Sequence, residues 1–591
     1  MWRFSPRLIR SSRWTSTFAR PESSTTRALP SLSVLLSSHK SHHQQDESHK
    51  LLVSFLGMAM ASCGIILGWN TRQPCLEEAA DDDTTTKILN WSGTHSVLVP
   101  NDSYWEPESI AEVEAIVQKC HAQGRSVRPV GSALSPNGLA FEAQGMMSMA
   151  HLDSVVKVDT VNRTVTAQAG ARVSQVIEAL RPHNLTLPNL ASIAEQQMGG
   201  FVQVGAHGTG KAIAPVDHYV TKLKIVTPSQ GMIELTSQDE DDELFHLTKV
   251  GLGCLGIVVE VTMQCIPAHD LVEHTFVLTR QQAREQRDEL LEKHKHMRYM
   301  WIPFEDAVVV VTNDPEETLP QSVPRQTSAP LSTKQLFQPL TDLLLTLSQE
   351  YADNSTTTTT TYTKETIEGM GFGELRDALL AFDPLNVDHV KRVNKAEAEF
   401  WRNSEGYQTK PSDQLLQFDC GGQQWVWEVC FPTGSQERNN GNDMDFMEEL
   451  LAGIERDNIP APAPIEQRWS ASSSSYMSPA YSRDPQGLHS WVGIIHYLPS
   501  DEEWQRRAIT ESFTGKYCDL MRKIGQQYSA TSHWAKLEIP KSIFQVADLR
   551  LFMQSRFPVA LFNETRARMD PKSILSNRTV DMAFGKPGHR Q

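Results

Sequence analysis

The sequence predicts an α+β protein with two folded domains behind a long N-terminal leader. From Ser96 to Pro267, short strand and helix patterns alternate without a regular strand–helix–strand repeat, which disfavours a doubly wound parallel sheet. After Pro267 the pattern changes to Gln- and Glu-rich helices separated by longer polar stretches. The chain has 591 residues, 39% of them apolar, which is enough for more than one hydrophobic core.

The leader has the composition of an organelle import signal. Residues 1–45 contain six arginines, many hydroxyl residues and a single acid, Glu22, which is typical of a mitochondrial transit peptide. Residues 51–69 carry no charge and are long enough to span a bilayer as a helix. We expect a membrane anchor there. The apolar part of a cleaved presequence and a secretory signal anchor are the alternatives.

Local patterns predict the elements of the first domain, residues 96–267. The expected elements are helix Pro107–Gln123, strand Arg125–Val130, strands Val155–Asp159 and Thr164–Ala169, helix Val173–Leu180, and strands Leu223–Thr227 and Met232–Thr236.

The second domain, residues 268–545, is expected to hold the substrate. Its predicted elements are helix Thr279–His296, strand Ala307–Thr312, helix Lys334–Gln349 and a low-complexity insertion at Asp353–Thr363. The last segment, residues 546–591, is expected to pack back on the first domain.

Two glycine-rich stretches predict a phosphate-containing ligand. Gly131 to Ser135 follow a β-rich segment, and Pro136 prevents a helix from continuing. The stretch Pro188–Lys211 contains five more glycines (Gly199, Gly200, Gly205, Gly208 and Gly210), so its backbone can approach a pyrophosphate closely. Two such loops suggest a dinucleotide.

Two rival nucleotide motifs are weaker. GAHGTGKA, ending at Ala212, lacks the hydroxyl that a triphosphate-binding loop uses for magnesium. The GxGxxG string from Gly251 to Gly256 precedes a strand pattern, whereas the dinucleotide fingerprint precedes a helix.

Two strings in the second domain carry polar groups suited to chemistry. Glu466 and Arg468 lie two residues apart, so a strand would place a carboxylate and a guanidinium on one face; an ordinary surface ion pair is the alternative. His533 and Lys536 bring an imidazole and an ammonium together.

Charge and cysteine content exclude some functions. The net charge is −16, which disfavours nucleic acid and suits a basic partner. The eight cysteines show no CxxC pair or metal-ligand spacing, so we predict no metal site.

Four strings carry a family resemblance: RPVGSALSPNG, TVTAQAGARV, NLASIAEQQMGGFVQVGAHGTG and GLGCLGIVVEVT. In this order they resemble the flavin-binding domain of the vanillyl-alcohol oxidase superfamily, and within it the aldonolactone oxidoreductases. The resemblance implies a two-subdomain FAD-binding domain of the PCMH type with an α+β substrate or cap domain. Many superfamily members bind flavin covalently through a histidine where this chain has Leu134, so we predict non-covalent FAD.

The resemblance also implies the site residues. Glu466, Arg468, His533 and Lys536 would line the substrate face of the flavin, and Ala191 would restrict oxygen access. Cys420 lies near the family's site but is not included among the catalytic residues. The residues expected to contact FAD are Pro129, Val130, Gly131, Ser132, Ala133, Leu134, Ser135, Ser192, Gly199, Gly200, Gly205, His207, Gly208, Thr209, Gly210, Gly256 and Ile257.

The implied reaction is the oxidation of L-galactono-1,4-lactone to ascorbate, with cytochrome c as electron acceptor at the intermembrane-space side of the mitochondrial inner membrane. An oxygen-using gulonolactone or alditol oxidase is one alternative. A mitochondrial membrane assembly factor that retains the fold is another.

Overall fold

The computed structural model describes residues 84–587, with gaps at 239–241, 329, 355–361, 419 and 541. All of these residues belong to one unit of the chain, Ala79–Gln591. The predicted transit peptide at 1–45 and the hydrophobic segment at 51–69 lie outside the described residues. Among the helices of the described part, none combines the length and the apolar composition that crossing a bilayer requires.

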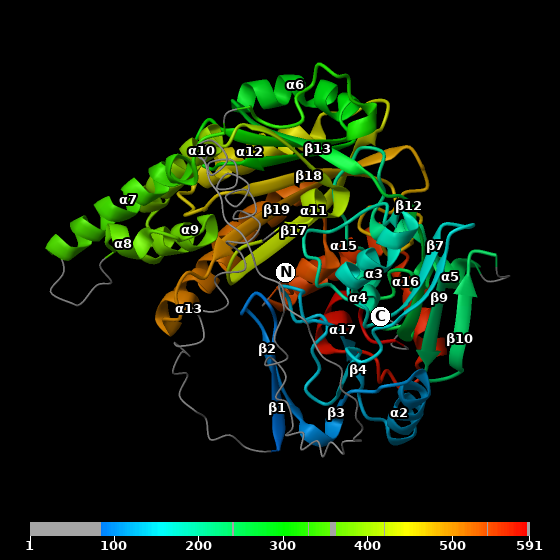
Figure 1. Ribbon diagram of the computed structural model, residues 1–591. Coiled ribbons are helices and arrows are strands. Elements are labelled where there is room, and N and C mark those ends of the chain that lie inside the picture. Colours follow the sequence, from blue (N-terminus) through cyan, green and yellow to red (C-terminus); the bar gives the residue numbers. More distant parts are fainter. Residues whose placement is uncertain are drawn as a thin grey trace, which may run out of the picture. The chain divides into compact units, whose positions relative to one another are not determined.

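The first part of the described chain builds four sheets with helices packed on them, the smallest being the pair β12-β8 (Figure 1). A hairpin pairs β1 with β2, β3-β5-β4 form a parallel sheet, and the largest sheet has the order β10-β9-β11-β7-β6. The elements are β1 (Thr85–Leu89), β2 (Ser96–Pro100), β3 (Tyr104–Trp105), α2 (Ile110–Gln123), β4 (Arg128–Val130), β5 (Met146–Ser148), β6 (Val155–Asp159), β7 (Thr164–Gln168), α3 (Val173–Leu180), β8 (Leu185–Thr186), α4 (Met198–Gln203), β9 (Val220–Thr227), β10 (Gly231–Thr236), α5 (Asp242–Thr248), β11 (Ile257–Gln264) and β12 (Ile266–Pro267).

The local predictions for this region are confirmed within a few residues. Helix α2 begins at Ile110 rather than Pro107, because Ser109 caps it by accepting a hydrogen bond from the Glu112 amide. It ends at Gly124, which adopts a left-handed conformation. The predicted strands at 155–159 and 164–169 pair antiparallel as β6 and β7.

The second part of the chain forms one mixed region around an eight-stranded sheet of order β16-β13-β15-β14-β18-β19-β17-β20, which we call the cap sheet. Its elements are β13 (Asp270–Leu278), α6 (Arg280–Lys293), β14 (His296–Trp301), β15 (Val308–Pro315), α7 (Thr333–Asn354), α8 (Lys364–Ile367), α9 (Phe372–Ala381), α10 (Val387–Asn403), β16 (Gly406–Pro411), α11 (Ser412–Leu416), β17 (Gln424–Ser435), α12 (Asn442–Arg456), β18 (Ile465–Ala471), β19 (Gly487–Tyr497), α13 (Glu503–Ser512), α14 (Cys518–Gln527) and β20 (Thr531–Ser532).

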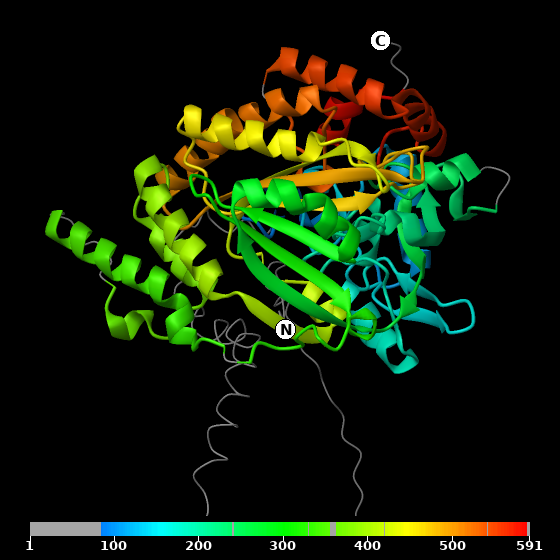
Figure 2. The same cartoon turned by 90° about the horizontal axis from the view of Figure 1, so that it is seen from above.

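One face of the cap sheet is covered by helices α6, α12 and α14 over a core rich in tryptophan and leucine (Figures 1 and 2). The glycine-rich stretch of the first domain contacts β14 through Thr209 and β18 through Gly210, and its His207 stacks on Trp491 of β19 on the opposite face. The predicted helix 279–296 is shorter than expected: α6 ends at Lys293 and His296 already belongs to β14, where apolar and aromatic side chains follow one another.

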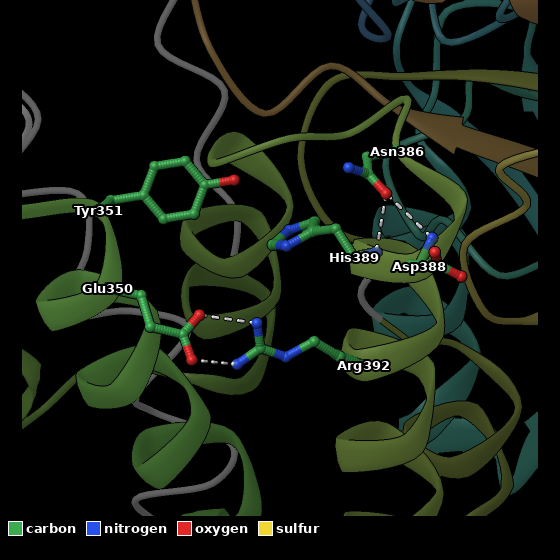
Figure 3. Close-up of a pocket in the computed structure, with 6 residues that line it drawn as sticks. All are labelled: Glu350, Tyr351, Asn386, Asp388, His389 and Arg392. Atoms are coloured by element: carbon green, nitrogen blue, oxygen red, sulfur yellow. Dashed lines mark hydrogen bonds and ion pairs between the residues drawn. The ribbon is translucent and has the colours of Figure 1, made fainter. Parts of the chain in front are cut away.

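Helices α7, α9 and α10 form a separate apolar cluster beside the sheet. A pocket of about 410 Å³ is lined by residues of α7 and of the start of α10 (Figure 3). Arg392 of α10 makes a two-pronged ion pair with Glu350 of α7 along its wall. None of the predicted site residues lines this pocket.

The chain ends in three helices, α15 (Ile543–Arg556), α16 (Val559–Met569) and α17 (Arg578–Phe584). The segment between α16 and α17 lies against β4: the Val127 amide donates to Ile574 O at 2.8 Å, and Arg128 Nη1 donates to Leu575 O at 2.6 Å. Arg128 is buried, and its other hydrogen bonds go to Leu139 O, Leu252 O and the Cys254 thiol. One guanidinium thus joins the first loop, the glycine turn before β11 and the C-terminal segment.

Candidate active site

Glu466 and Arg468 lie on one face of β18, as the two-residue spacing predicts. Glu466 Oε2 is 3.5 Å from Arg468 Nη2, and Glu466 Oε1 is 3.8 Å from Arg298 Nη1 of β14. The Glu466 and Arg468 side chains are only 18% and 7% exposed, so this is not a surface pair. Glu466 Oε1 and Arg468 Nε are buried and have no hydrogen-bond partner among the described residues, which leaves them available to a ligand.

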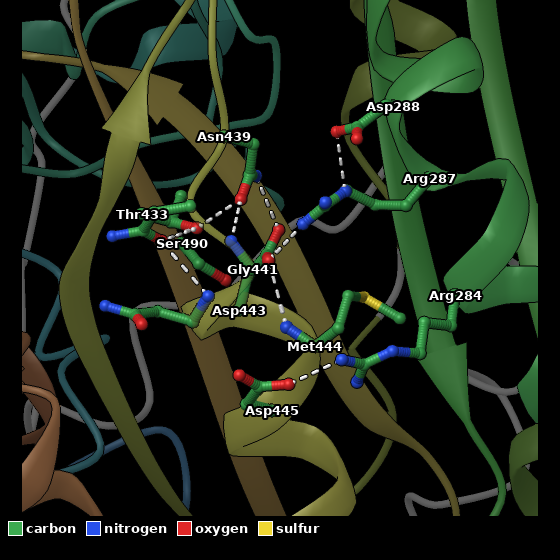
Figure 4. Close-up of polar contacts among 12 residues, drawn as sticks. Arg284, Arg287, Asp288, Thr433, Asn439, Gly441, Asp443, Met444, Asp445 and Ser490 are labelled. Carbon is green, nitrogen blue, oxygen red and sulfur yellow. Dashed lines mark hydrogen bonds and ion pairs between the residues drawn. The ribbon is translucent and has the colours of Figure 1, made fainter.

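The opposite face of β18 carries Gln467 and Trp469, which fix the strand in place. Trp469 Nε1 donates to Asp443 Oδ2 at 2.8 Å. Arg287 of α6 forms a buried ion pair with the same carboxylate (Figure 4). Gln467 Nε2 donates to Ser490 Oγ of β19. Residues that alternate with Glu466 and Arg468 therefore anchor the strand under α6 and α12, and the catalytic candidates point the other way.

Glu428 of β17 is the residue that the sequence patterns missed. Its Oε1 accepts from Arg468 Nη2 at 2.8 Å, while its Oε2 accepts from Lys536 Nζ at 2.5 Å and lies 3.3 Å from His207 Nε2. We call these four residues the Glu428 cluster. The available signal was a single acid inside the otherwise apolar strand WVWEVCF, since a charge in such a run needs buried partners.

Electrostatics make the Glu428 cluster a fixed set of charges. Burial opposes ionisation of Glu428, but Lys536 and Arg468 outweigh it and hold its pKa well below the usual value. Burial likewise opposes the charge on Arg468, yet the Glu466 and Glu428 carboxylates raise the pKa of its guanidinium. The carboxylate and the guanidinium are thus both charged at neutral pH.

The two histidines near Glu428 are buried. Burial lowers the pKa of the His207 imidazole, whose ring stacks on Trp491 with centroids 3.6 Å apart. Burial also lowers the pKa of His533, and His533 Nδ1 accepts from the Ala535 amide at 3.1 Å. His533 therefore caps the short 3₁₀ helix Trp534–Lys536 that presents Lys536 to Glu428. His207 was predicted to contact the cofactor; its Nε2 faces Glu428.

The loop that carries Ala191 and Ser192 is linked to Glu466 through intermediate residues. Ala191 is buried, and Ser192 O accepts from the Phe418 amide at 2.9 Å. The Phe418 ring lies 4.0 Å from the Arg298 guanidinium, which in turn faces Glu466. Three contacts, Ser192–Phe418, Phe418–Arg298 and Arg298–Glu466, therefore link the loop that carries Ala191 to the carboxylate on β18.

The first predicted phosphate loop presents unpaired backbone donors. Within the described residues, the amides of Gly131, Ser132, Ala133, Leu134 and Ser135 donate no hydrogen bond. The loop is held from behind, because the Trp91 amide donates to Ala133 O and the Ser132 hydroxyl donates to Glu195 O. Gln197 Oε1, beside Gly131, is buried without a partner. Five free amides next to an unsatisfied buried oxygen fit a polar cofactor with phosphates.

The glycine-rich stretch Pro188–Lys211 makes two kinds of contact. Gly208 packs so tightly that a Cβ there would lie 2.4 Å from both Asn189 Oδ1 and Leu190 O. Further along, Thr209 donates to Met297 O of β14, and the Gly210 amide donates to Trp469 O of β18 at 2.7 Å. Thr209 and Gly210, predicted as cofactor contacts, thus dock the stretch onto the cap sheet.

The remaining predicted contacts lie in three places. Pro129 and Val130 end β4 directly before the free amides. Gly256 precedes β11, which begins at Ile257, and packs beside Ile225 of β9. Gly199, Gly200 and Gly205 belong to α4 and its end. Their roles toward the cofactor stay predictions.

Comparison with known proteins places the chain in a family. Residues 102–237 match the family described as FAD binding domain, and residues 261–583 match the family described as D-arabinono-1,4-lactone oxidase. The sequence is 46% identical over 498 residues to the mitochondrial L-galactono-1,4-lactone dehydrogenase of Arabidopsis thaliana, covering 84% of this chain and 81% of that protein. This chain is an aldonolactone oxidoreductase.

Other relatives of this aldonolactone oxidoreductase agree with that family. A mitochondrial L-galactono-1,4-lactone dehydrogenase of Oryza sativa is 45% identical over 502 residues, covering 85% of this chain and 84% of that protein. L-gulonolactone oxidase of Bos taurus is 25% identical over 500 residues, covering 84% and 98%. The crystal structure of cholesterol oxidase from Brevibacterium sterolicum shares the fold, with a TM-score of 0.64 at 16% identity, covering 85% and 97%. The predicted FAD-binding PCMH-type fold and the FAD cofactor are confirmed.

The aldonolactone oxidoreductase also brings His207, Glu428 and His533 together, with one donor atom from each within 4.8 Å of the others. Such a group could in principle hold a metal ion. Both Glu428 oxygens, however, already accept from protein cations, which satisfies the carboxylate without a metal. The absence of a metal site stays a prediction.

Proposed function

We propose that this protein oxidises L-galactono-1,4-lactone to L-ascorbate and passes the electrons to cytochrome c. The observation that carries the proposal is the buried Glu466–Arg468 pair, whose Glu466 Oε1 and Arg468 Nε lack partners among the described residues. A free carboxylate oxygen beside a free guanidinium donor suits a neutral, hydroxyl-bearing lactone. The dehydrogenases of Arabidopsis and Oryza named above support the choice of lactone.

The proposed chemistry divides one oxidation between two groups. A hydroxyl-bearing ring carbon next to the lactone carbonyl loses a hydride, and its oxygen loses a proton, so that a ketone forms and tautomerises to the enediol. FAD, when bound, supplies the two-electron acceptor. Glu466 orients the hydroxyl and accepts its proton through Oε1. Arg468 donates to the oxygen on which negative charge develops.

The charges around this pair support stabilisation of an anion. Arg298, Arg468 and Lys536 contribute three positive charges, and Glu428 and Glu466 contribute two negative ones. With the histidines neutral, one positive charge is left over in a largely buried site. Negative charge that forms during the reaction is therefore compensated where it develops.

The acceptor and the location belong to the same proposal. The buried Ala191 lies on the loop that binds Phe418, a neighbour of Arg298, and is proposed to limit oxygen access to the flavin. The acidic composition suits cytochrome c, a basic carrier. The Arg-rich leader and the mitochondrial names of the relatives support a position at the inner membrane, facing the intermembrane space. Leu134 offers no nucleophile, so FAD is proposed to be bound non-covalently.

One absorbance experiment tests the proposal. Purified protein is precipitated with acid, and flavin colour in the supernatant identifies non-covalent FAD. A second aliquot receives L-galactono-1,4-lactone with either oxidised cytochrome c or air as the sole acceptor. We expect fast cytochrome reduction and slow turnover in air. Fast peroxide formation in air would instead assign an oxidase, and the absence of flavin reduction by this lactone would refute the substrate.

A further inference from the structure

Glu428 occupies a central place on the face of the cap sheet that carries Glu466. In the pairing of β17, β19 and β18, Glu428 lies opposite Gly493, and Gly493 lies opposite Glu466. The two carboxylates therefore stand on the same face with a glycine between them. The Glu428 side chain is 1% exposed, whereas that of Glu466 is 18% exposed.

The carboxylates of Glu428 and Glu466 differ in how many of their oxygens already have a hydrogen-bond partner. Glu428 Oε1 is taken by Arg468, and Oε2 is taken by Lys536 and faces His207. Glu466 keeps one buried oxygen without a hydrogen-bond partner in the described structure. Glu466 is thus equipped to receive a substrate proton, and Glu428 is equipped to hold protein cations.

The partners of Glu428 come from three separate elements. Arg468 lies on β18, Lys536 ends the 3₁₀ helix after β20, and His207 belongs to the glycine-rich stretch of the first domain. Long, flexible Arg and Lys side chains lose considerable rotamer freedom when they are fixed in one geometry. An anion built into a central strand can fix them before the substrate arrives.

We propose that Glu428 is a positioning residue that holds the Arg468 guanidinium and the Lys536 ammonium in their working geometry. The inference rests on the proposed function, because it assigns these two cations to the oxidation of a lactone. Both Glu428 oxygens are occupied by these cations, so Glu428 acts on the reaction through its two partners.

A double-mutant cycle tests this inference. The variants are Glu428→Gln, Lys536→Met and the combination, all loaded with FAD and assayed for kcat and KM by cytochrome c reduction. Glu428→Gln keeps the size of the side chain and removes its charge. We expect kcat to fall about 100-fold with KM changed less than about threefold, since both Glu428 oxygens are bound by protein cations and neither is left to hydrogen-bond the substrate. In the Lys536→Met background, the further loss should be at least about tenfold smaller.

Thermal unfolding of the wild type, the two single variants and the double variant gives a readout that needs no substrate. Glu428→Gln should lower Tm, and its effect should shrink in the Lys536→Met background, where one opposing charge is gone. If Glu428→Gln alone does not fold, the charge-balanced double variant is compared with Lys536→Met. Glu397→Gln is the matched control: Glu397 is another buried glutamate of this domain, on α10, and accepts from Trp401 Nε1. Its kinetics should match those of the wild type.

Two outcomes would overturn the proposal. Coupling in Tm without coupling in kcat would make the pair a structural contact only. A Glu428→Gln effect of the same size in both backgrounds would show that Glu428 does not act through Lys536. Failure of the proposed function is seen separately, as wild-type protein inactive on L-galactono-1,4-lactone; the cycle is then run on L-gulono- and D-arabinono-1,4-lactone.

Discussion

Gly493→Ala tests whether the space between Glu466 and Glu428 belongs to the substrate. A Cβ at Gly493 would lie 3.8 Å from Glu428 Cγ, which is ordinary van der Waals contact, and the residue is not in the left-handed region. The fold can therefore accept the methyl group. Replacing glycine by alanine at a compatible position stabilises a protein by about 0.4–1 kcal/mol through the unfolded state.

The same methyl group is expected to impair catalysis. It would occupy the strip of sheet surface between the two carboxylates, where a lactone bound to Glu466 Oε1 must lie. Steric overlap of one methyl group in a packed site costs about 1–3 kcal/mol, which corresponds to about a 5- to 150-fold loss in kcat/KM. We expect this loss together with an unchanged or slightly higher Tm.

The assay combines cytochrome c reduction kinetics with thermal unfolding of the FAD-loaded protein. Gly208→Ala is the matched control, because its Cβ would lie 2.4 Å from Leu190 O and from Asn189 Oδ1. That variant should have a lower Tm and reduced FAD content. Unchanged kcat/KM in Gly493→Ala, or a fall in Tm like that of Gly208→Ala, would refute the reasoning.

Three further predictions follow from the same contacts. Glu466→Gln should lower kcat/KM by about 10²–10³ at normal FAD content, because the free carboxylate oxygen loses its charge; an activity near that of the wild type would contradict its role. Ala191→Gly should raise peroxide production in air, measured with a coupled peroxidase, and an unchanged yield would count against the gate. Burial lowers the pKa of His496 to about 4, whereas an unfolded histidine titrates near 6.5, so the unfolded state binds more protons as the pH falls. The free energy of unfolding should therefore fall between about pH 6.5 and pH 4, by about 3 kcal/mol for this residue, and urea unfolding of His496→Gln should show a shallower pH dependence than the wild type.

Local sequence patterns correctly predicted the structural features that depend on residues close together in the chain. The two-residue repeat of a strand is enough to place Glu466 and Arg468 on one face, and Ser109 and Gly124 mark the ends of α2. The structure refined these limits by only a few residues. Gly208 does allow a close approach, but to Asn189 and Leu190 of the protein itself, so the predicted approach of these glycines to a pyrophosphate stays a prediction.

The Glu428 cluster could not be predicted in this way. Its hydrogen bonds join residues 40, 108 and 221 positions apart in the chain, to Arg468, Lys536 and His207. No local periodicity encodes such separations, which are set by the order of strands in the cap sheet. The position of Glu428 in an otherwise apolar strand predicts that its charge has buried partners, but it does not predict which residues they are.

The link between Arg128 and the C-terminal segment ties cofactor binding to residues far along the chain. Ile574 O and Leu575 O accept hydrogen bonds from the Val127 amide and from Arg128, directly before the first cofactor loop. A substitution that displaces this segment would therefore disturb β4 while leaving every residue of the loop intact. Flavin retention thereby reports on the packing of the C-terminal segment as well as on the loop itself.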